Sequence, residues 1–214
     1  MNTIKLDSTN TGEIVSESIK VLSEGGVIVY PTETAYGLGA DIYNRKAVFR
    51  IYEIKERPGS MPLSVIISDK KMAESICGNI TPLTAKIIEH FMPGPLTLIL
   101  DAGHKLPEYM ASDDGTAAFR IPGNLFCLKM LKEFGKPVTA TSANLSGEPE
   151  ARKIQDINKK VLSKADLVID AGEIKSESVS TVVKFNGIDY DILREGAVKK
   201  SDIINFIQEL NIEK

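Results

Sequence analysis

The chain lacks tryptophan and is poor in other aromatic residues, which make up 6% of its 214 residues. Stacking platforms for single-stranded nucleic acid depend on aromatic rings, so this scarcity argues against such a platform. Cysteine is also rare: Cys77 and Cys127 lie far apart and have no CxxC spacing. A disulfide framework or a zinc site is therefore not expected, and a reducing compartment is the simpler interpretation.

Patterns that define several enzyme classes are missing as well. The chain contains no GxxxxGK[ST] phosphate loop and no GxGxxG after a strand. The two histidines, His90 and His104, have no nucleophile motif or metal-ligand spacing around them, which argues against a triad hydrolase or a metalloprotease. No metal held by a dedicated set of protein ligands is expected. Any Mg²⁺ is expected to arrive bound to phosphates.

The charge balance and the apolar pattern predict a soluble protein. A net charge of −3 argues against a general nucleic-acid coat, although it is compatible with a local basic cleft. Residues 1–7 contain no apolar signal-peptide core, and no apolar run approaches membrane-spanning length. We therefore expect a cytoplasmic protein, in which 43% hydrophobic residues suffice for a sizeable core.

The order of apolar segments predicts a single α/β domain over residues 1–214, with a twisted, mixed parallel and antiparallel sheet flanked by helices. Leu125, Leu128 and Leu131 are expected to share one side of their helix. Helices are expected around 15–22, from Asn44 to Arg57, at 70–76, 82–91, 125–134 and 154–162, and after Ser201. Strands are expected at 27–30, 63–67, 96–100, 117–121, 138–141, 167–169, 179–185 and 190–193, with a loop at 103–115 and a hairpin turn at Asn186-Gly187.

The segment 30–39, with the sequence YPTETAYGLG, is unusually polar for a connection. It follows an apolar run that predicts a buried strand, and it precedes the helix expected at Asn44. Ligands of α/β proteins usually bind at such strand-to-helix turns. Gly37 and Gly39 are expected to let the backbone approach a ligand closely. Glu33 is expected to be a structural or supporting group rather than a catalytic base.

Lys55 and Arg57 stand at the expected end of the second helix, just before Pro58. One interpretation is that these cations complement the helix dipole. The other is a phosphate clamp, in which lysine supplies a point charge and arginine a planar fork that matches phosphate oxygens. Spacing alone leaves both interpretations open.

Polar residues at other strand ends are also candidates. Ser142 and Asn144 follow an expected strand, where they could cap or turn the chain or donate hydrogen bonds to phosphate oxygens. Arg120 lies in an apolar strand, where it either faces solvent or receives a carboxylate in bidentate geometry. Arg194 ends the last strand and Ser180 begins another, and both are also compatible with ordinary turn and strand chemistry.

Seven motifs follow one another along the chain: residues 30–39, 55–58 with Pro62-Leu63, 93–97, 119–122, 141–147, 180–182 and 193–196. Each is modest alone, but together and in this order they resemble the YrdC-like threonylcarbamoyl-AMP synthase family over nearly the whole chain. The resemblance implies a YrdC-like fold with a concave basic cleft. It also implies the single-domain form, without the extra C-terminal domain of longer members.

The resemblance implies an enzyme, a nucleotidyltransferase that forms threonylcarbamoyl-AMP and pyrophosphate from L-threonine, bicarbonate or CO₂, and ATP. The product would supply the N6-threonylcarbamoyladenosine at position 37 of tRNA through separate transfer machinery. Threonine's amine would first become a carbamate, whose oxygen then attacks the α-phosphorus of ATP. Such chemistry needs mainly positioning and charge stabilisation.

The resemblance also implies roles for individual residues. In the threonine site, Thr34 contacts the amino acid, Arg120 holds its carboxylate, Ser180 lies beside it, and the backbone near Ala140 lines the pocket. The residues implied around the triphosphate, as catalytic and nucleotide-binding groups, are Lys55, Arg57, Ser142 and Asn144. Further nucleotide contacts are implied for Thr116, Glu150 and Arg194.

Two positions depart from common forms of the pattern. Met61 replaces a Lys or His that would contact phosphate or nucleotide, and Ile66 replaces a His that would contact threonine. The main alternative function is a non-catalytic module that binds double-stranded RNA or tRNA in the same cleft, against which the net charge argues. A generic ATP-dependent carboxylate ligase would require an acceptor domain, which the sequence does not indicate.

Overall fold

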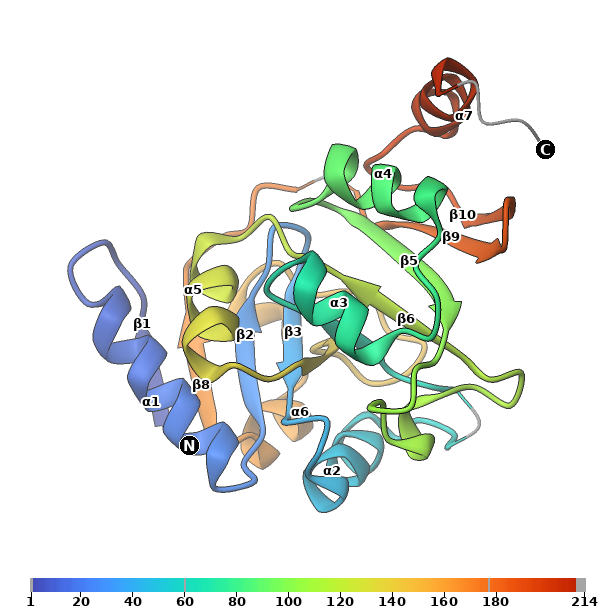
Figure 1. Cartoon of the computed structure of the whole chain (residues 1–214). Helices are drawn as coiled ribbons and strands as arrows, with labels where there is room; N and C mark the ends of the chain where they lie inside the picture. Colours follow the sequence, from blue (N-terminus) through green and yellow to red (C-terminus); the bar gives the residue numbers. More distant parts are fainter. Residues whose placement is uncertain (1, 60, 177, 211–214) are drawn as a thin grey trace.

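The computed structural model describes residues 2–59, 61–176 and 178–210, and its strands form one sheet (Figure 1). The strands are β1 (Asn2–Lys5), β2 (Ile28–Pro31), β3 (Tyr36–Gly39), β4 (Ser64–Ile66), β5 (Leu96–Asp101), β6 (Thr116–Arg120), β7 (Val138–Ser142), β8 (Leu167–Asp170), β9 (Thr181–Asn186) and β10 (Asp189–Arg194). Their order across the sheet is β1-β8-β2-β3-β7-β4-β6-β5-β9-β10. The sheet is mixed, because it contains both parallel pairs, such as β1 with β8, and antiparallel pairs, such as β2 with β3.

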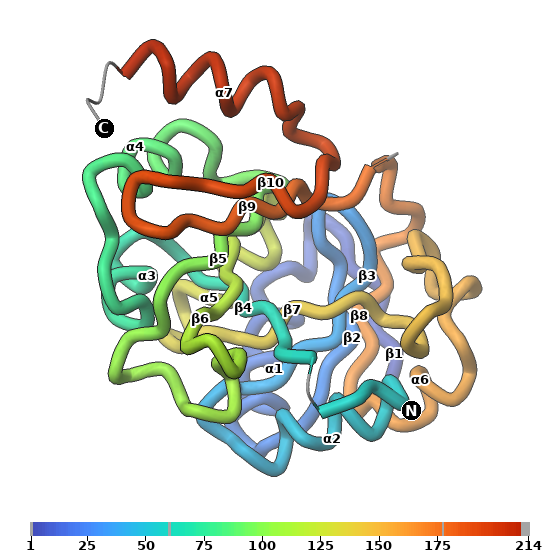
Figure 2. The backbone as a smooth tube through the Cα atoms, turned by 90° about the vertical axis from the view of Figure 1, so that its right-hand side faces the viewer, coloured from blue at the N-terminus to red at the C-terminus, as the bar shows by residue number. Residues whose placement is uncertain are grey.

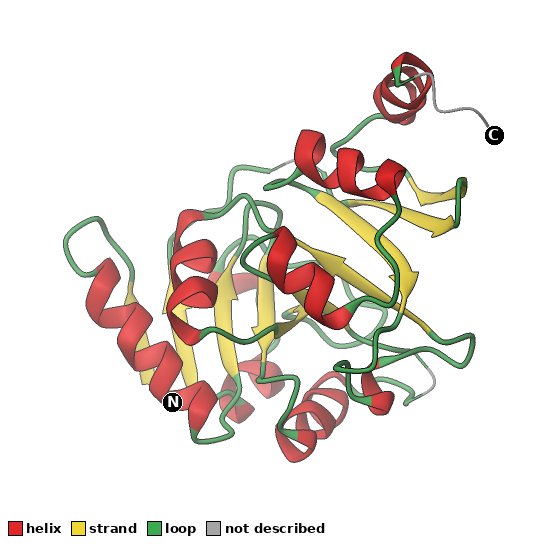
Figure 3. Ribbon diagram, in the orientation of Figure 1, coloured by secondary structure: helices red, strands yellow, loops and turns green. Residues whose placement is uncertain are grey.

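Helices cover both faces of this sheet (Figure 3). They are α1 (Thr11–Ser23), α2 (Arg45–Lys55), α3 (Lys70–Ile76), α4 (Pro82–Phe91), α5 (Leu125–Phe134), α6 (Lys159–Lys164) and α7 (Lys200–Glu209), with short 3-10 turns η1 (Glu108–Met110) and η2 (Ile154–Asp156). Alternate residues of β2 belong to opposite clusters: Ile28 and Tyr30 share one with residues of α1 and α5, whereas Val29 belongs to the cluster that includes residues of α2. The period of two in a strand thus divides the core into two layers. No helix of the described residues is long and apolar enough to cross a bilayer.

Local sequence signals explain several elements that the structure confirms. The helices expected at 70–76, 82–91 and 125–134 have these bounds. The side chain of Asn44 caps α2 by accepting a hydrogen bond from the amide of Ala47 at 3.1 Å. Gly187, at φ +67°, closes the expected hairpin between β9 and β10 (Figure 2), which lies beside β5.

The segment 30–39 is not a strand-to-helix turn, as predicted, but a tight β-hairpin. After a turn at 32–35, β3 runs back antiparallel to β2, with Pro31 opposite Tyr36. The glycines of β3 accommodate Tyr30: a Cβ atom on Gly37 or Gly39 would lie 3.0 or 2.9 Å from its ring. Packing against Tyr30 is therefore a principal reason for these glycines, although Gly37 also borders the candidate site.

The face of α5 differs from the prediction. Leu125 is 82% exposed, and the buried residues are Phe126, Cys127, Met130 and Leu131. The leucine spacing therefore did not identify the buried stripe, because the more varied apolar residues of this helix pack against α1 and β2 instead.

Four further details depart from the prediction. The expected helix at 154–162 is interrupted at Ile157 and Asn158, where the side chain of Asn158 caps a separate helix, α6. Ser201 does not cap α7, whose N-cap is Lys199. Strand β1 was not predicted, and η1 lies within the loop expected at 103–115.

Candidate active site

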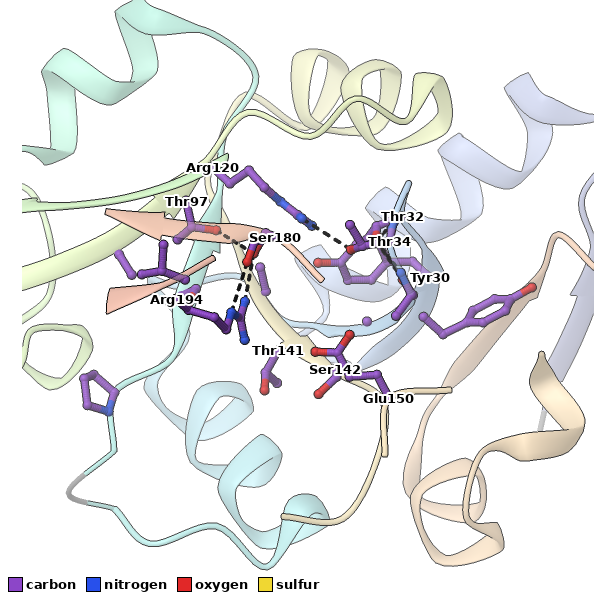
Figure 4. Close-up of a pocket in the computed structure, with 18 of the residues that line it drawn as sticks. Tyr30, Thr32, Thr34, Thr97, Arg120, Thr141, Ser142, Glu150, Ser180 and Arg194 are labelled. Carbon is purple, nitrogen blue, oxygen red and sulfur yellow. Dashed lines mark hydrogen bonds between the residues drawn. The ribbon is translucent and has the colours of Figure 1, made fainter. Parts of the chain in front are cut away.

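A pocket of about 380 Å³ lies over the central strands, between the β2–β3 turn and the end of β10 (Figure 4). It brings together segments far apart in the sequence and contains most of the predicted site residues. Those that line it are Thr34, Arg57, Arg120, Ala140, Ser142, Glu150, Ser180 and Arg194. The lining also contains polar residues for which the sequence indicated no individual role, namely Thr32, Ser64, Thr97 and Thr141.

The β2–β3 turn presents Thr34 to the pocket through an internal hydrogen-bond network. The hydroxyl of Thr32 donates to the carbonyl of Ala35 at 2.7 Å and accepts from the amides of Thr34 and Ala35. Its Oγ1 also lies 3.1 Å from Oγ1 of Thr34. The turn is thus closed by a side chain, a common function of threonine in turns. Since Thr32 fixes the turn, the Thr34 hydroxyl has a defined position.

Arg120 is buried at the end of β6 and lines the pocket. Its Nη1 donates a long hydrogen bond of 3.4 Å to Oγ1 of Thr34, and it lies 3.4 Å from Oε1 of Glu33. Neither oxygen of Glu33 accepts a hydrogen bond from the described residues, so this ion pair is electrostatic rather than directed. Glu33 therefore compensates the guanidinium charge from the protein side, as a supporting group would.

Two buried groups near Arg120, Tyr30 and Cys127, titrate at high pH. The hydroxyl of Tyr30 donates to the carbonyl of Thr139 at 3.1 Å, and burial raises its pKa well above the usual value. Burial likewise raises the pKa of the Cys127 thiol, which donates to the carbonyl of Pro31. Both side chains are therefore neutral packing groups rather than nucleophiles.

Lys55 is buried, does not line the pocket, and contacts the end of β7 and the residues after it. Its Nζ donates to the carbonyl oxygens of Ser142 and Asn144 and to Oδ1 of Asn144. Desolvation and the nearby Arg57 lower its pKa to about 8, whereas the carboxylates of Glu150 and Glu148 act in the opposite direction. In this structure Lys55 therefore joins Ser142, the last residue of β7, to Asn144 in the segment that follows.

Asn144 completes this network without lining the pocket. Its Oδ1 accepts from the hydroxyl of Ser142 at 2.6 Å, and its Nδ2 donates to the carbonyl of Glu148 at 2.5 Å. The structure thus brings Lys55, Ser142 and Asn144 together, and of these three only Ser142 lines the pocket, so their place around a triphosphate stays a prediction.

Arg57 extends from just beyond α2 into the pocket. Its Nε donates to the carbonyl of Met61 at 3.0 Å, and its Nη2 to that of Pro62 at 3.2 Å. Met61 is the first of the two positions that depart from the common pattern, and its side chain is half exposed. At the second, Ile66 is buried in the sheet core and does not line the pocket.

Thr116 lies outside the pocket lining. Its hydroxyl donates to Oδ1 of Asp114 at 2.7 Å and lies 2.9 Å from the hydroxyl of Ser112. The carboxylate of Asp114 pairs with Lys184 of β9 at 2.5 Å. This network fixes the turn before β6, and a nucleotide contact for Thr116 remains a prediction.

Across the pocket from the β2–β3 turn, the hydroxyls of Ser180 and Thr97 lie 3.0 Å apart. Arg194 closes this side of the pocket: its Nε donates to the carbonyl of Ser180 and its Nη2 to the Ser180 hydroxyl, both at 3.0 Å. Thr97 lies within one of the motifs quoted from the sequence. In the sequence, Thr97 alternates with Leu96 and Leu98, which are buried in the core. This alternation was the signal that Thr97 points to the other face of the strand, where the pocket lies.

The Sua5/YciO/YrdC family model, described as telomere recombination, matches residues 20–196. The chain belongs to this family. A relative from Bacillus subtilis, named threonylcarbamoyl-AMP synthase, is 34% identical over 208 residues, which cover 97% of this chain and 60% of the relative. A protein of the same name from Pyrococcus abyssi is 32% identical over 191 residues, covering 89% of this chain and 56% of the relative.

A protein from Methanocaldococcus jannaschii, provisionally named threonylcarbamoyl-AMP synthase, is closer in length to the present chain than these two relatives are. It is 36% identical over 180 residues, which cover 84% of each chain. The chain therefore matches most of one relative, but only a little more than half of the B. subtilis and P. abyssi proteins.

Solved structures of the family share the fold. The crystal structure of P. abyssi Sua5 complexed with L-threonine matches with a TM-score of 0.89 and 29% identity, over 97% of this chain and 61% of that chain. Escherichia coli YciO matches with a TM-score of 0.81 over 92% of this chain and 95% of that chain. At 24% identity, this second likeness concerns the fold alone. The predicted family and mixed α/β fold are thus confirmed, whereas the basic character of the cleft stays a prediction.

Proposed function

We propose that this protein is an L-threonylcarbamoyladenylate synthase, which makes threonylcarbamoyl-AMP and pyrophosphate from L-threonine, bicarbonate or CO₂, and ATP. The names of the curated relatives and the threonine complex of P. abyssi Sua5 support this activity. The observation that carries the proposal is that one pocket is lined by both of the residue groups proposed for the reaction: Thr34, Arg120 and Ser180 for threonine, and Arg57 and Ser142 for phosphates.

The reaction would be a nucleotidyl transfer in this pocket. The threonine carboxylate would bind Arg120, whose planar fork suits two oxygens. The oxygen of the threonine carbamate would form a bond to the α-phosphorus as the bond to the bridging oxygen breaks, and pyrophosphate would leave with the electron pair. Arg57 and Ser142 would stabilise the phosphate oxygens. The carbamate is already anionic, so the adenylation step needs no general base.

The remaining parts of the proposal concern partners and location. Mg²⁺ would enter with the triphosphate rather than on a protein site of its own, and would neutralise part of the phosphate charge. The product would pass to machinery that transfers the threonylcarbamoyl group to tRNA. A cytoplasmic location fits the two unpaired cysteines. A non-catalytic double-stranded RNA-binding module is not favoured, because the relatives are named as synthases.

The deciding experiment measures pyrophosphate release by purified protein with ATP, Mg²⁺, bicarbonate and candidate amino acids. Release that requires both threonine and bicarbonate supports the synthase. A folded protein that releases none, yet binds double-stranded RNA in a salt-dependent manner, would establish the alternative.

The Arg120→Ala variant tests the assignment of the threonine site. We expect it to raise the KM for threonine about 10- to 100-fold, since a hydrogen bond to a charged group contributes about 1.5–3 kcal/mol, and to change the KM for ATP much less. Arg57→Ala should show the reverse pattern. As a matched control, Arg45→Ala removes an arginine that stacks over Phe49 outside the pocket lining. A larger effect of Arg120→Ala on ATP than on threonine would contradict the assignment.

A further inference from the structure

Arg194 makes an unusual pair of contacts for an exposed arginine. Two of its nitrogens donate to the same residue, Ser180: Nε donates to the carbonyl oxygen and Nη2 to the hydroxyl, each at 3.0 Å. Within the described part of the chain, Arg194 forms no ion pair with an acidic side chain. A guanidinium carries more N–H donors than these two contacts use. Its charge and its remaining donors are therefore available to an anionic ligand.

The position of Arg194 between two groups of pocket residues makes these contacts informative. In Figure 4, Arg120 and Ser180 lie on one side of it, and Ser142 and Glu150 lie on the other. The first side is where we place threonine, and the second is where we place the phosphates. Arg194 thus bonds a residue of the proposed threonine subsite and lines the same pocket as the residues of the proposed phosphate subsite.

The hydrogen bond from Arg194 also determines what Ser180 can do. Because the Ser180 oxygen accepts from Nη2 of Arg194, its own proton must be directed elsewhere, either to Thr97, 3.0 Å away, or to a ligand. A ligand oxygen beside Ser180 therefore meets a hydroxyl that is oriented to donate. Without Arg194, Thr97 would be the remaining described partner of this hydroxyl, which could then donate or accept.

We propose that Arg194 couples the two subsites, so that the nucleotide and threonine each raise the affinity for the other. This inference rests on the proposed function. A phosphate held by the unused donors fixes the Arg194 side chain, and a fixed Arg194 keeps the Ser180 hydroxyl oriented toward the threonine carboxylate. The entropic cost of ordering the arginine is then borne by whichever ligand binds first. We expect a coupling of about tenfold, within the usual range for linked sites, and equal in both directions.

The test is calorimetric titration of L-threonine with and without saturating α,β-methylene-ATP and Mg²⁺, followed by the reverse titration. This analogue cannot be cleaved at the bond that the reaction breaks, so binding is measured without turnover. In the wild-type protein we expect the analogue to raise threonine affinity about tenfold, and threonine to raise analogue affinity by the same factor.

The variants separate coupling from simple loss of a contact. Arg194→Met keeps the aliphatic stem but removes every donor. Arg194→Lys keeps the charge but replaces the planar fork, in which separate nitrogens contact the carbonyl and the hydroxyl of Ser180, with a single ammonium nitrogen. Ser180→Ala leaves Arg194 and its charge in place. In all three, the coupling factor should fall to about one, and Ser180→Ala should retain most of its analogue affinity. Arg45→Met is the matched control and should keep the wild-type coupling.

The outcomes distinguish this inference from the proposed function. Independent or mutually weakened binding of the two ligands to the wild-type protein would overturn the coupling and leave the synthase standing. Full coupling in Arg194→Lys or Ser180→Ala would also overturn it. A folded wild-type protein that binds neither ligand would overturn the proposed function, and the coupling with it.

Discussion

At the scale of single residues, the most unusual group is the buried ammonium of Lys55. Its contacts with three oxygens of residues 142–144 compensate part of its desolvation, yet its pKa falls to about 8. A neutral amine has fewer protons to donate, so deprotonation would release part of the loop that positions Ser142. The charge of Lys55 is thus linked to the geometry of the proposed phosphate site.

This linkage predicts that affinity for α,β-methylene-ATP falls as pH rises through about 8. The stability effect has the opposite sign: between about pH 8 and the ordinary lysine value near 10.5, the unfolded chain binds more protons, so the free energy of unfolding rises with pH. Titrations of analogue binding from pH 7 to 9.5 measure the first effect. Lys55→Met should bind weakly and without this pH dependence, whereas the exposed Lys129→Met should keep it. Persistence of the dependence in Lys55→Met would refute the link.

Individual site residues were predictable from the sequence to different degrees. Arg57, Arg120 and Arg194 occupy positions beside strand or helix ends, and the structure places all three on the pocket. The directions of Lys55 and Asn144 were not predictable, because they depend on a contact between segments that are distant in the sequence. Nothing local in the sequence specifies that contact.

At the scale of elements, the β2–β3 hairpin links packing to the site. The ring of Tyr30 fills the space above Gly37 and Gly39, and the turn that connects β2 to β3 carries Thr34. The sequence predicted the importance of this segment but not its shape. Glycines within a short strand were interpreted as ligand contacts, whereas a neighbouring ring requires them.

We expect Gly39→Ala to lower the free energy of unfolding by about 1–3 kcal/mol, the usual effect of overpacking a core. The new Cβ would lie 2.9 Å from the ring of Tyr30 and 2.9 Å from a methyl group of Val138, and neither can move freely in the sheet. Urea denaturation measures the change. Gly59→Ala is the control: no atom lies within 4 Å of its added Cβ, so a change below about 0.5 kcal/mol is expected. Equal stabilities for the two variants would contradict this account.

At the scale of the whole molecule, α7 is attached more lightly than the other long helices. Of its described residues only Ile203 is fully buried, and Phe206 reaches α4 by stacking on His90, with ring centroids 4.0 Å apart. Figure 1 shows α7 at the margin of the fold, beyond α4 and the β9–β10 hairpin. Elements with few buried contacts open more readily than the core.

Hydrogen exchange should therefore be faster in α7 than in β7 and its neighbours. Mass spectrometry of deuterium uptake would show amides of α7 exchanging well before those of β2, β3 and β7 under the same conditions. Phe206→Ala should accelerate exchange in α7 while leaving the central strands unchanged. Protection of α7 equal to that of β7 would show that the helix is part of the central cooperative unit.

The sequence predicted the class of the fold but not the order of its strands. Alternating strand and helix segments and the Asn186-Gly187 turn indicated a mixed α/β sheet, as observed. The order could not be predicted because pairs such as Asn2 with Leu167 join segments from opposite ends of the chain. Such pairs depend on the completed core rather than on local propensity.

The position of β8 between β1 and β2 has a consequence for synthesis on the ribosome. Strands β1 and β2 lie near the start of the sequence, and both pair with β8 at Leu167. Until translation has passed Asp170, the nascent chain carries β2 without its parallel neighbour, and its apolar residues stay accessible to chaperones. This half of the sheet is therefore completed only late in translation, although its first strands are made early.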